Sequence, residues 1–240
     1  MINSHQETFM NLDELGMTCP EYRPTFDYGK EYIDSFHKFL SKCQNQDGTL
    51  IQIKNGRWLG GNIIQGWLRR EDALKLYELA YFVQGDILEL GSYHGLSTTI
   101  LSKANQCSPY KKHIYSVDLD PECVKQTECN LRSKGLNRDI TTCCADATTA
   151  VKTFGADGRK FEFAFIDHSH AYEPVYTVCQ ELGKVMIKGG WCLFHDFNDA
   201  RNRDSQNPDY GVYQAVTEGL DATKFEFYGI YGCTALYRGI

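Results

Sequence analysis

A short apolar segment, followed by a glycine turn and an amphipathic segment, most constrains how this chain can fold. It spans residues 85–104, GDILELGSYHGLSTTILSKA. The aliphatic residues at 87–90 are typical of a buried strand, Gly91 and Gly95 mark a tight turn, and the following apolar residues recur at helical spacing. In open α/β sheets ligands bind beyond the carboxyl ends of the strands, so this turn is the first candidate binding site.

The residues of this turn differ from those of a dinucleotide-binding turn. A dinucleotide-binding turn carries a glycine at its middle position, where the backbone approaches a pyrophosphate. Tyr93 occupies that position here, which favours a ligand without phosphates. Glu89, near the end of the strand, can accept hydrogen bonds from an ammonium group or from amides of the turn.

The rest of the chain alternates between strand-like and helix-like segments. Strands are expected at residues 113–118, 140–144, 161–166 and 191–194, and helices at 121–134, 146–154, 172–187 and 210–220. Segments 225–228 and 234–237 are too close together for a crossover helix and should pair antiparallel. We therefore predict an α/β, Rossmann-like fold, with a seven-stranded, mostly parallel sheet, an antiparallel closing strand and helices on both faces.

The segment before residue 61 has weaker patterns. Residues 1–25 show no periodicity, 28–43 have helical spacing, and a short hairpin is expected around 50–58. We expect residues 1–60 to form an N-terminal appendage and 61–240 the main domain, which begins with a helix in GWLRREDALKLYELAYFV. The helix at 28–43 could pack on its own sheet or on that of a second copy, which leaves a homo-oligomer open.

Charge and composition exclude several classes of partner. The net charge of -6 argues against a general nucleic-acid binder or an anionic-membrane binder. No apolar run reaches the length of a membrane span, and the first residues lack the features of a secretory signal, so we expect a cytoplasmic protein. The ten cysteines form no CxxC pattern, which favours reduced, buried thiols over disulfides or zinc ligands.

Five acidic residues lie at the ends of five successive predicted strands. In a parallel sheet all five would meet at the same edge, as expected for a binding site. Each also has a simpler interpretation as a helix cap or turn residue. The five are Glu89, Asp118, Asp146, Asp167 and Asp196.

The turn ELGSYHGLST, together with these acids, resembles motif I of class I S-adenosylmethionine (SAM) methyltransferases, in particular that of catechol O-methyltransferase and its relatives. The resemblance implies that Asp118 takes the ribose hydroxyls and that Asp146 lies near the adenine. Trp67 would lie over the cofactor, although it could instead anchor the core. The cofactor-binding residues implied are Gly66, Trp67, Glu89, Gly91, Ser92, Tyr93, Gly95, Ser97, Asp118, Leu119, Ala145, Asp146, Asp167 and His168.

The segments FIDHSHAY and GGWCLFHDFND resemble the metal sites of metal-dependent O-methyltransferases, including those of antibiotic pathways. The resemblance implies metal ligands at Asp167, His195 and Asp196, with Mg²⁺ as the usual ion. His195 stands where those relatives carry an acid, which moves the preference toward manganese, iron or zinc, or leaves the site without a metal. His170 matches the family's catalytic base beside Asp167, and its alternative is a loop histidine bonded to backbone.

The resemblance implies a SAM-dependent methyltransferase that acts on a small-molecule acceptor, most often at a hydroxyl oxygen, without nucleic-acid or membrane partners. Two alternatives stay open: an NAD-linked oxidoreductase, and a SAM-binding module without turnover. The charged loop at residues 198–210 is expected to be either a lid over the acceptor or a solvated loop.

Overall fold

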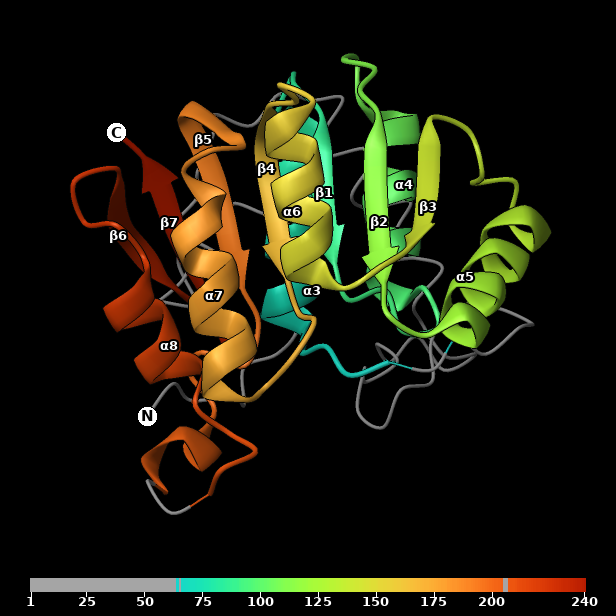
Figure 1. Ribbon diagram of the computed structural model, residues 1–240. Helices are drawn as coiled ribbons and strands as arrows, with labels where there is room; N and C mark the ends of the chain where they lie inside the picture. Colours follow the sequence, from blue (N-terminus) through green and yellow to red (C-terminus); the bar gives the residue numbers. More distant parts are fainter. Residues whose placement is uncertain (1–63, 65, 205–206) are drawn as a thin grey trace, which may run out of the picture.

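The structure is a computed structural model that describes residues 64, 66–204 and 207–240 (Figure 1). The appendage, helix and hairpin expected within residues 1–60 lie outside the described residues. The division of the chain at residue 61 therefore remains a prediction.

The described chain forms a seven-stranded sheet in the order β3-β2-β1-β4-β5-β7-β6. Strands β1 to β5 are parallel, and β7 runs antiparallel to both β5 and β6, as predicted. The predicted fold class is therefore confirmed. The strands are β1 (Ile87–Leu90), β2 (Ile114–Asp118), β3 (Ile140–Cys144), β4 (Phe161–Ile166), β5 (Met186–Phe194), β6 (Phe225–Tyr231) and β7 (Thr234–Gly239).

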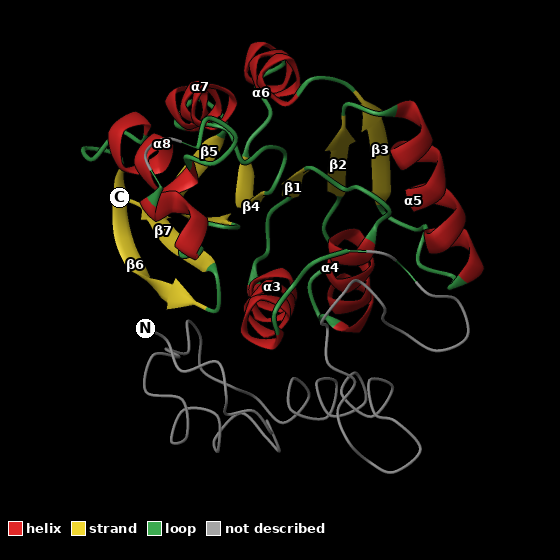
Figure 2. Cartoon of the chain, turned by 90° about the horizontal axis from the view of Figure 1, so that it is seen from below, coloured by secondary structure: helices red, strands yellow, loops and turns green. Residues whose placement is uncertain are grey.

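Helices cover both faces of this sheet (Figure 2). On one face lie α3 (Arg70–Phe82) and α4 (Leu96–Cys107), with α5 (Pro121–Ser133) beside β2 and β3. The other face carries α6 (Ala147–Ala156), α7 (Tyr172–Leu182) and α8 (Val212–Gly219). Each face has its own apolar core, built around Tyr77 and Phe163 on the first and around Phe161 and Phe194 on the second.

Two boundaries differ most from the sequence-based expectation, by five residues each. Helix α7 ends at Leu182, five residues earlier than predicted, because residues 183–185 form a turn and β5 begins at Met186. The first half of β5 has an irregular burial pattern and contains Gly189 with a φ of 80°, so it carries no alternating signal. A short 3-10 helix, η1 (Ala200–Arg203), lies inside the expected loop. None of the helices in the described part of the chain has the length and apolar character needed to span a bilayer.

Candidate functional site

The carboxyl ends of the parallel strands place the five predicted acids along one edge of the sheet, at the bottom of Figure 1. Asp118 ends β2, Asp167 directly follows β4, and Asp196 lies two residues after β5. Strands β1 to β5 all run parallel, so their carboxyl ends, and the acids at those ends, lie at the same edge of the sheet. The prediction that these acids share an edge is confirmed.

A cavity of about 750 Å³ opens along this edge. Most of the residues predicted to bind the cofactor line it, and so do all of those predicted as catalytic or metal-binding. The predicted residues on its wall are Gly66, Trp67, Gly91, Ser92, Tyr93, Ser97, Asp118, Asp167, His168, His170, His195 and Asp196.

The glycine turn passes directly against the end of β4. Gly91 has a φ of 93°, and a Cβ at this position would lie 2.2 Å from the carbonyl oxygen of Asp167. Only glycine fits both the left-handed backbone and this close approach. Asp118 binds the same turn, because its Oδ2 accepts a hydrogen bond of 2.7 Å from the backbone N–H of Tyr93. The turn and the predicted ribose-binding carboxylate therefore form one rigid wall of the cavity.

Glu89 lies beneath this wall instead of on it. Its side chain is fully buried, and Oε2 accepts hydrogen bonds from the hydroxyls of Thr98 (2.6 Å) and Ser116 (2.5 Å). Its Oε1 atom is buried, and no described residue makes a hydrogen bond to it. Burial raises the pKa of Glu89 to about 7, against the opposing effect of these hydrogen bonds. Glu89 therefore holds β1, β2 and α4 together under the turn, and contact with a cofactor remains a prediction.

Four other predicted cofactor residues, Gly95, Leu119, Ala145 and Asp146, are not on the cavity wall. Asp146 caps α6, where its Oδ1 accepts hydrogen bonds from the backbone N–H (2.9 Å) and hydroxyl (3.0 Å) of Thr149. These bonds lower its pKa, so the helix-cap alternative describes the contacts observed. Leu119 is 70% exposed beside Asp118. The cofactor roles of these four residues remain predictions.

Two aromatic side chains stand at the rim of the cavity. Trp67 is 65% exposed, which excludes its alternative role as a core anchor. Its ring centroid lies 5.5 Å from that of Tyr93, which stacks on His94 at 3.9 Å. Exposed aromatic faces next to a polar cavity are suited to contact with a planar ligand group.

Two histidines and two carboxylates form the polar centre of the cavity. The Nδ1 atom of His195 lies 3.1 Å from Oδ1 of Asp167 and 3.2 Å from Oδ2 of Asp196. The Nε2 atom of His170 lies 3.0 Å from the same oxygen of Asp196. Asp196 has a φ of 57°, a left-handed conformation that is uncommon outside glycine and that clusters at functional sites. The backbone at the end of β5 thus turns this carboxylate toward both histidines.

The charges of this centre depend on one another. The hydrogen bond to Asp196 raises the pKa of His170, against the opposing effect of burial. Burial alone would lower the pKa of His195, but the carboxylates of Asp167 and Asp196 outweigh it and raise the pKa well above its ordinary value. Burial would raise the pKa of Asp196, but both histidines outweigh it, and its pKa falls below the ordinary range. Positive charge between the two carboxylates is therefore strongly favoured.

The donor set fits a divalent metal ion. Although Nδ1 of His195 lies close to two carboxylate oxygens, it is a buried polar atom that has no hydrogen-bond partner among the residues that the structure describes. Ligand bonds of about 2.0–2.2 Å place neighbouring ligand atoms about 3 Å apart, close to the spacings of His195 with Asp167 and Asp196. A set of two carboxylates and one imidazole nitrogen suits manganese, iron, cobalt or zinc better than magnesium.

The structure also brings residues into this region that the sequence did not indicate. Arg201 and Asp209 reach the cavity wall from the predicted lid loop. Asp72 and Cys233 contact His195 from behind. Asp72 and Cys233 are 161 residues apart, so no spacing in the sequence could connect them.

Comparisons with known proteins agree with this geometry. Residues 88–197 match the family described as "Methyltransferase domain". Uncharacterized protein R132 of Acanthamoeba polyphaga mimivirus is 23% identical over 158 residues, which are 61% of this chain and 66% of that protein. This chain thus spans slightly less than two thirds of the length of that relative.

Two solved structures share the fold. The O-methyltransferase TomG from Streptomyces achromogenes, solved with SAM, has a TM-score of 0.59 and 19% identity over 72% of this chain and 81% of that chain. The O-methyltransferase from Bacillus cereus, solved with S-adenosylhomocysteine (SAH), has a TM-score of 0.57 and 14% identity over 70% of this chain and 81% of that chain. The resemblance of the glycine turn to methyltransferases is thereby confirmed: residues 88–197 match a methyltransferase domain, and the described chain has the fold of these two O-methyltransferases.

Proposed function

We propose that this methyltransferase transfers a methyl group from SAM to a hydroxyl oxygen of a small-molecule acceptor, and that a divalent metal ion bound by Asp167, His195 and Asp196 assists it. One observation carries the proposal. A continuous cavity joins the glycine turn and Asp118 to the group formed by Asp167, His170 and Asp196. A donor held at the turn would therefore lie next to residues that can hold an acceptor and remove its proton.

The cofactor side of the cavity offers groups that suit a sulfonium nucleoside. The Asp118 carboxylate has two acceptor atoms for a vicinal diol, and Gly91 and Ser92 line the wall beside it. Trp67 and Tyr93 supply the apolar rim. The SAM and SAH bound to the two O-methyltransferases of similar fold support this assignment.

On the acceptor side, His170 is the proposed general base. Its Nε2–H donates to Asp196, which leaves Nδ1 as the nitrogen that accepts a proton. The acceptor hydroxyl gives its proton to His170, its oxygen forms the new bond to the methyl carbon, and SAH leaves as the carbon–sulfur bond breaks. Because the methyl group is already activated, the protein mainly aligns the reactants and removes this proton.

The three proposed metal ligands contribute to catalysis through the ion that they would hold. Asp167, His195 and Asp196, which all line the cavity, would hold the ion. When bound, such an ion lowers the pKa of a coordinated hydroxyl and orients it.

The size of the cavity and the charge of the chain favour a small-molecule acceptor. A cavity volume of about 750 Å³ lies in the range of small-molecule sites, and the net charge of -6 disfavours a nucleic-acid acceptor.

Calorimetric titrations of the full chain with SAM, SAH and NAD⁺ test this proposal. We expect binding of SAM and SAH, and none of NAD⁺, because Tyr93 occupies the position of the pyrophosphate-binding glycine. Binding of NAD⁺ in place of SAM would support the oxidoreductase alternative. Binding of SAM that is insensitive to Asp118→Ala would contradict the proposed cofactor position.

A further inference from the structure

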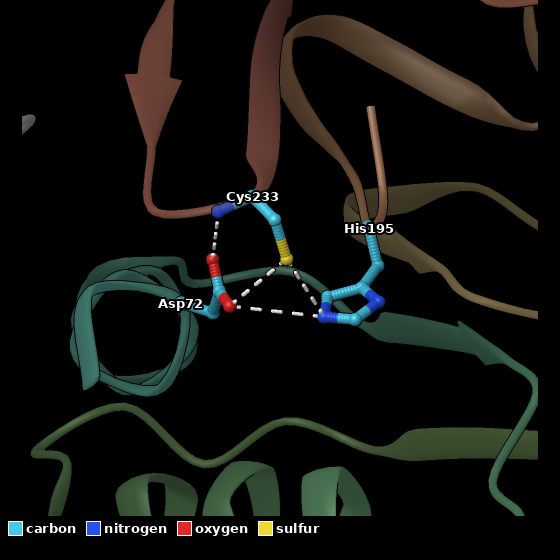
Figure 3. Close-up of side chains that lie close together, drawn as sticks. All are labelled: Asp72, His195 and Cys233. Carbon is cyan, nitrogen blue, oxygen red and sulfur yellow. Dashed lines mark hydrogen bonds and ion pairs between the residues drawn. The ribbon is translucent and has the colours of Figure 1, made fainter. Parts of the chain in front are cut away.

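His195 forms a buried cluster (Figure 3) with two side chains that do not line the cavity. Asp72 comes from the first turn of α3, Cys233 from the hairpin between β6 and β7, and His195 directly follows β5. All three side chains are buried. The cluster therefore joins three parts of the fold directly behind the proposed metal ligand.

The hydrogen bonds of this cluster have a defined direction. The carboxylate of Asp72 can only accept, and it accepts from the backbone N–H of Cys233 (2.9 Å) and of Arg69 (2.7 Å). The Sγ atom of Cys233 lies 3.2 Å from Oδ2 of Asp72, so the thiol donates to Asp72. The same sulfur lies 3.3 Å from Nε2 of His195. Because the single thiol proton is donated to Asp72, the sulfur can only accept here, from the imidazole N–H. The chain of donors thus places a proton on Nε2 of His195.

The opposite ring nitrogen is the one that faces the cavity. When the ring is neutral and its proton is on Nε2, the lone pair of Nδ1 points toward the space between Asp167 and Asp196, where that atom has no hydrogen-bond partner among the described residues. A metal-binding histidine typically donates its other N–H to a second group, which sets the tautomer and the ring orientation. The Asp72 and Cys233 side chains have the required position and direction for that task.

We propose that Asp72 and Cys233 are positioning residues that present Nδ1 of His195 to the metal ion and thereby direct the site toward transition metals instead of Mg²⁺. This inference rests on the proposed function, because it requires an ion at Asp167, His195 and Asp196. Neither Asp72 nor Cys233 lines the cavity, so both act through His195.

A competing arrangement uses the same three side chains as ligands of a separate ion. Their ligand atoms lie 3.2 to 3.7 Å apart, a spacing that an ion could occupy. However, the carboxylate of Asp72 already accepts hydrogen bonds at both oxygens and the thiol of Cys233 has a carboxylate beside it. In the described part of the chain, Nδ1 of His195 has no hydrogen-bond partner. The unsatisfied atom is on the cavity side, which favours the positioning role.

The experiment is a titration of metal-free, full-length protein with Co²⁺, followed by its absorption spectrum. We expect wild type to bind Co²⁺ with the visible bands of nitrogen and oxygen ligands and without a thiolate-to-cobalt charge-transfer band. Asp72→Asn and Cys233→Ala should weaken binding by roughly 10- to 100-fold, whereas Cys233→Ser, which keeps a donor and an acceptor, should retain most of it.

Matched controls separate positioning from general damage to the fold. Cys179→Ala removes a buried thiol from α7, and Glu78→Gln removes a buried carboxylate from α3 that is bonded to Lys75. Both should bind Co²⁺ as wild type does. If Asp72→Asn fails to fold, the pair Cys233→Ala and Cys233→Ser still decides the question, because neither removes the bond from Asp72 to the backbone.

The outcomes distinguish the inference from the function on which it rests. Wild-type affinity in both Asp72→Asn and Cys233→Ala would overturn the inference while leaving the metal ion of the proposed function in place. A thiolate charge-transfer band in wild type would place the ion on Cys233, and would overturn both the inference and the ligand set of the proposed function. Absence of Co²⁺ binding by folded wild type would overturn the metal-assisted function and the inference together.

Discussion

The Nε2 atom of His170 lies 3.0 Å from Oδ2 of Asp196. The same carboxylate oxygen lies 3.2 Å from Nδ1 of His195, the proposed metal ligand. Asp196 therefore links the residue that would take the acceptor proton to the residue that would hold the ion. Because they share this carboxylate, the proposed base His170 and the proposed metal ligand His195 lie next to each other on the cavity wall.

Replacing His170 with glutamine should separate turnover from cofactor binding. The variant lacks a base, so we expect kcat to fall by about 10²- to 10⁴-fold while the Kd for SAM changes little. The measurements are SAH formation under saturating SAM and calorimetric titration with SAM. His113→Gln is the matched control, since His113 lies away from the cavity and contacts Thr141. Equal losses of turnover and SAM affinity would make His170 structural, and unchanged turnover would favour another base.

Changing His195 to glutamate should change which metal supports activity. The substitution restores the acid that the resemblance to metal-dependent O-methyltransferases implies at this position, and an all-oxygen set suits Mg²⁺. We expect wild type to be activated best by Mn²⁺ or Co²⁺ and the variant by Mg²⁺, in activity assays of metal-free protein with each ion added back. An identical metal preference in both proteins would show that His195 is not a ligand.

Asp118 and Asp146 form a matched pair. Asp118 ends β2 and Asp146 lies just after the neighbouring strand β3, but only Asp118 lies on the cavity wall. Asp118→Ala should weaken SAM binding by about 10-fold or more, the cost of a lost hydrogen bond to a charged group. Asp146→Ala should mainly lower the free energy of unfolding, by about 1 kcal/mol, because it removes the cap of α6. Chemical denaturation and SAM titration on both variants test this division. A larger loss of SAM affinity in Asp146→Ala than in Asp118→Ala would instead support a contact between Asp146 and the adenine.

The buried Glu89 should leave a signature in the pH dependence of stability. Its pKa is raised from 4.5 to about 7, so the folded state binds more protons than the unfolded state between these values. Its contribution to the free energy of unfolding therefore falls as pH rises through this range, by about 3 kcal/mol in total. Glu89→Gln lacks this titration, so its stability relative to wild type should increase from pH 4.5 to above 7. Parallel stability curves for the two proteins would mean that Glu89 has an ordinary pKa.

Much of the fold could be predicted because it depends on local patterns. The strand at 161–166 was predicted at its observed bounds, since its apolar run is bounded by turn residues on both sides. Asp118, Asp167 and Asp196 could be brought to one edge without any contact information, because the order of parallel strands alone decides which ends meet. Gly91 could likewise be recognised, since a tight turn against a neighbouring strand requires it.

What could not be predicted depends on packing between distant segments. In the sequence, Glu89 resembles an acid that binds a ligand. In the structure it is buried below the turn, where its carboxylate accepts hydrogen bonds from Thr98 of α4 and Ser116 of β2. The contact of Asp72 with Cys233 requires α3 and the terminal hairpin to meet behind β5. Such a contact has no periodic signal, so only the three-dimensional structure shows it.

The central claim is that one cavity holds the cofactor at Asp118 and an ion at Asp167, His195 and Asp196. A crystal structure of the protein grown with SAH and Mn²⁺, with anomalous data to locate the metal, tests this claim most directly. We predict ribose hydroxyls on Asp118 and a single anomalous peak bonded to Nδ1 of His195 and to both carboxylates. SAH away from the glycine turn, or no anomalous density among these three side chains, would contradict the account.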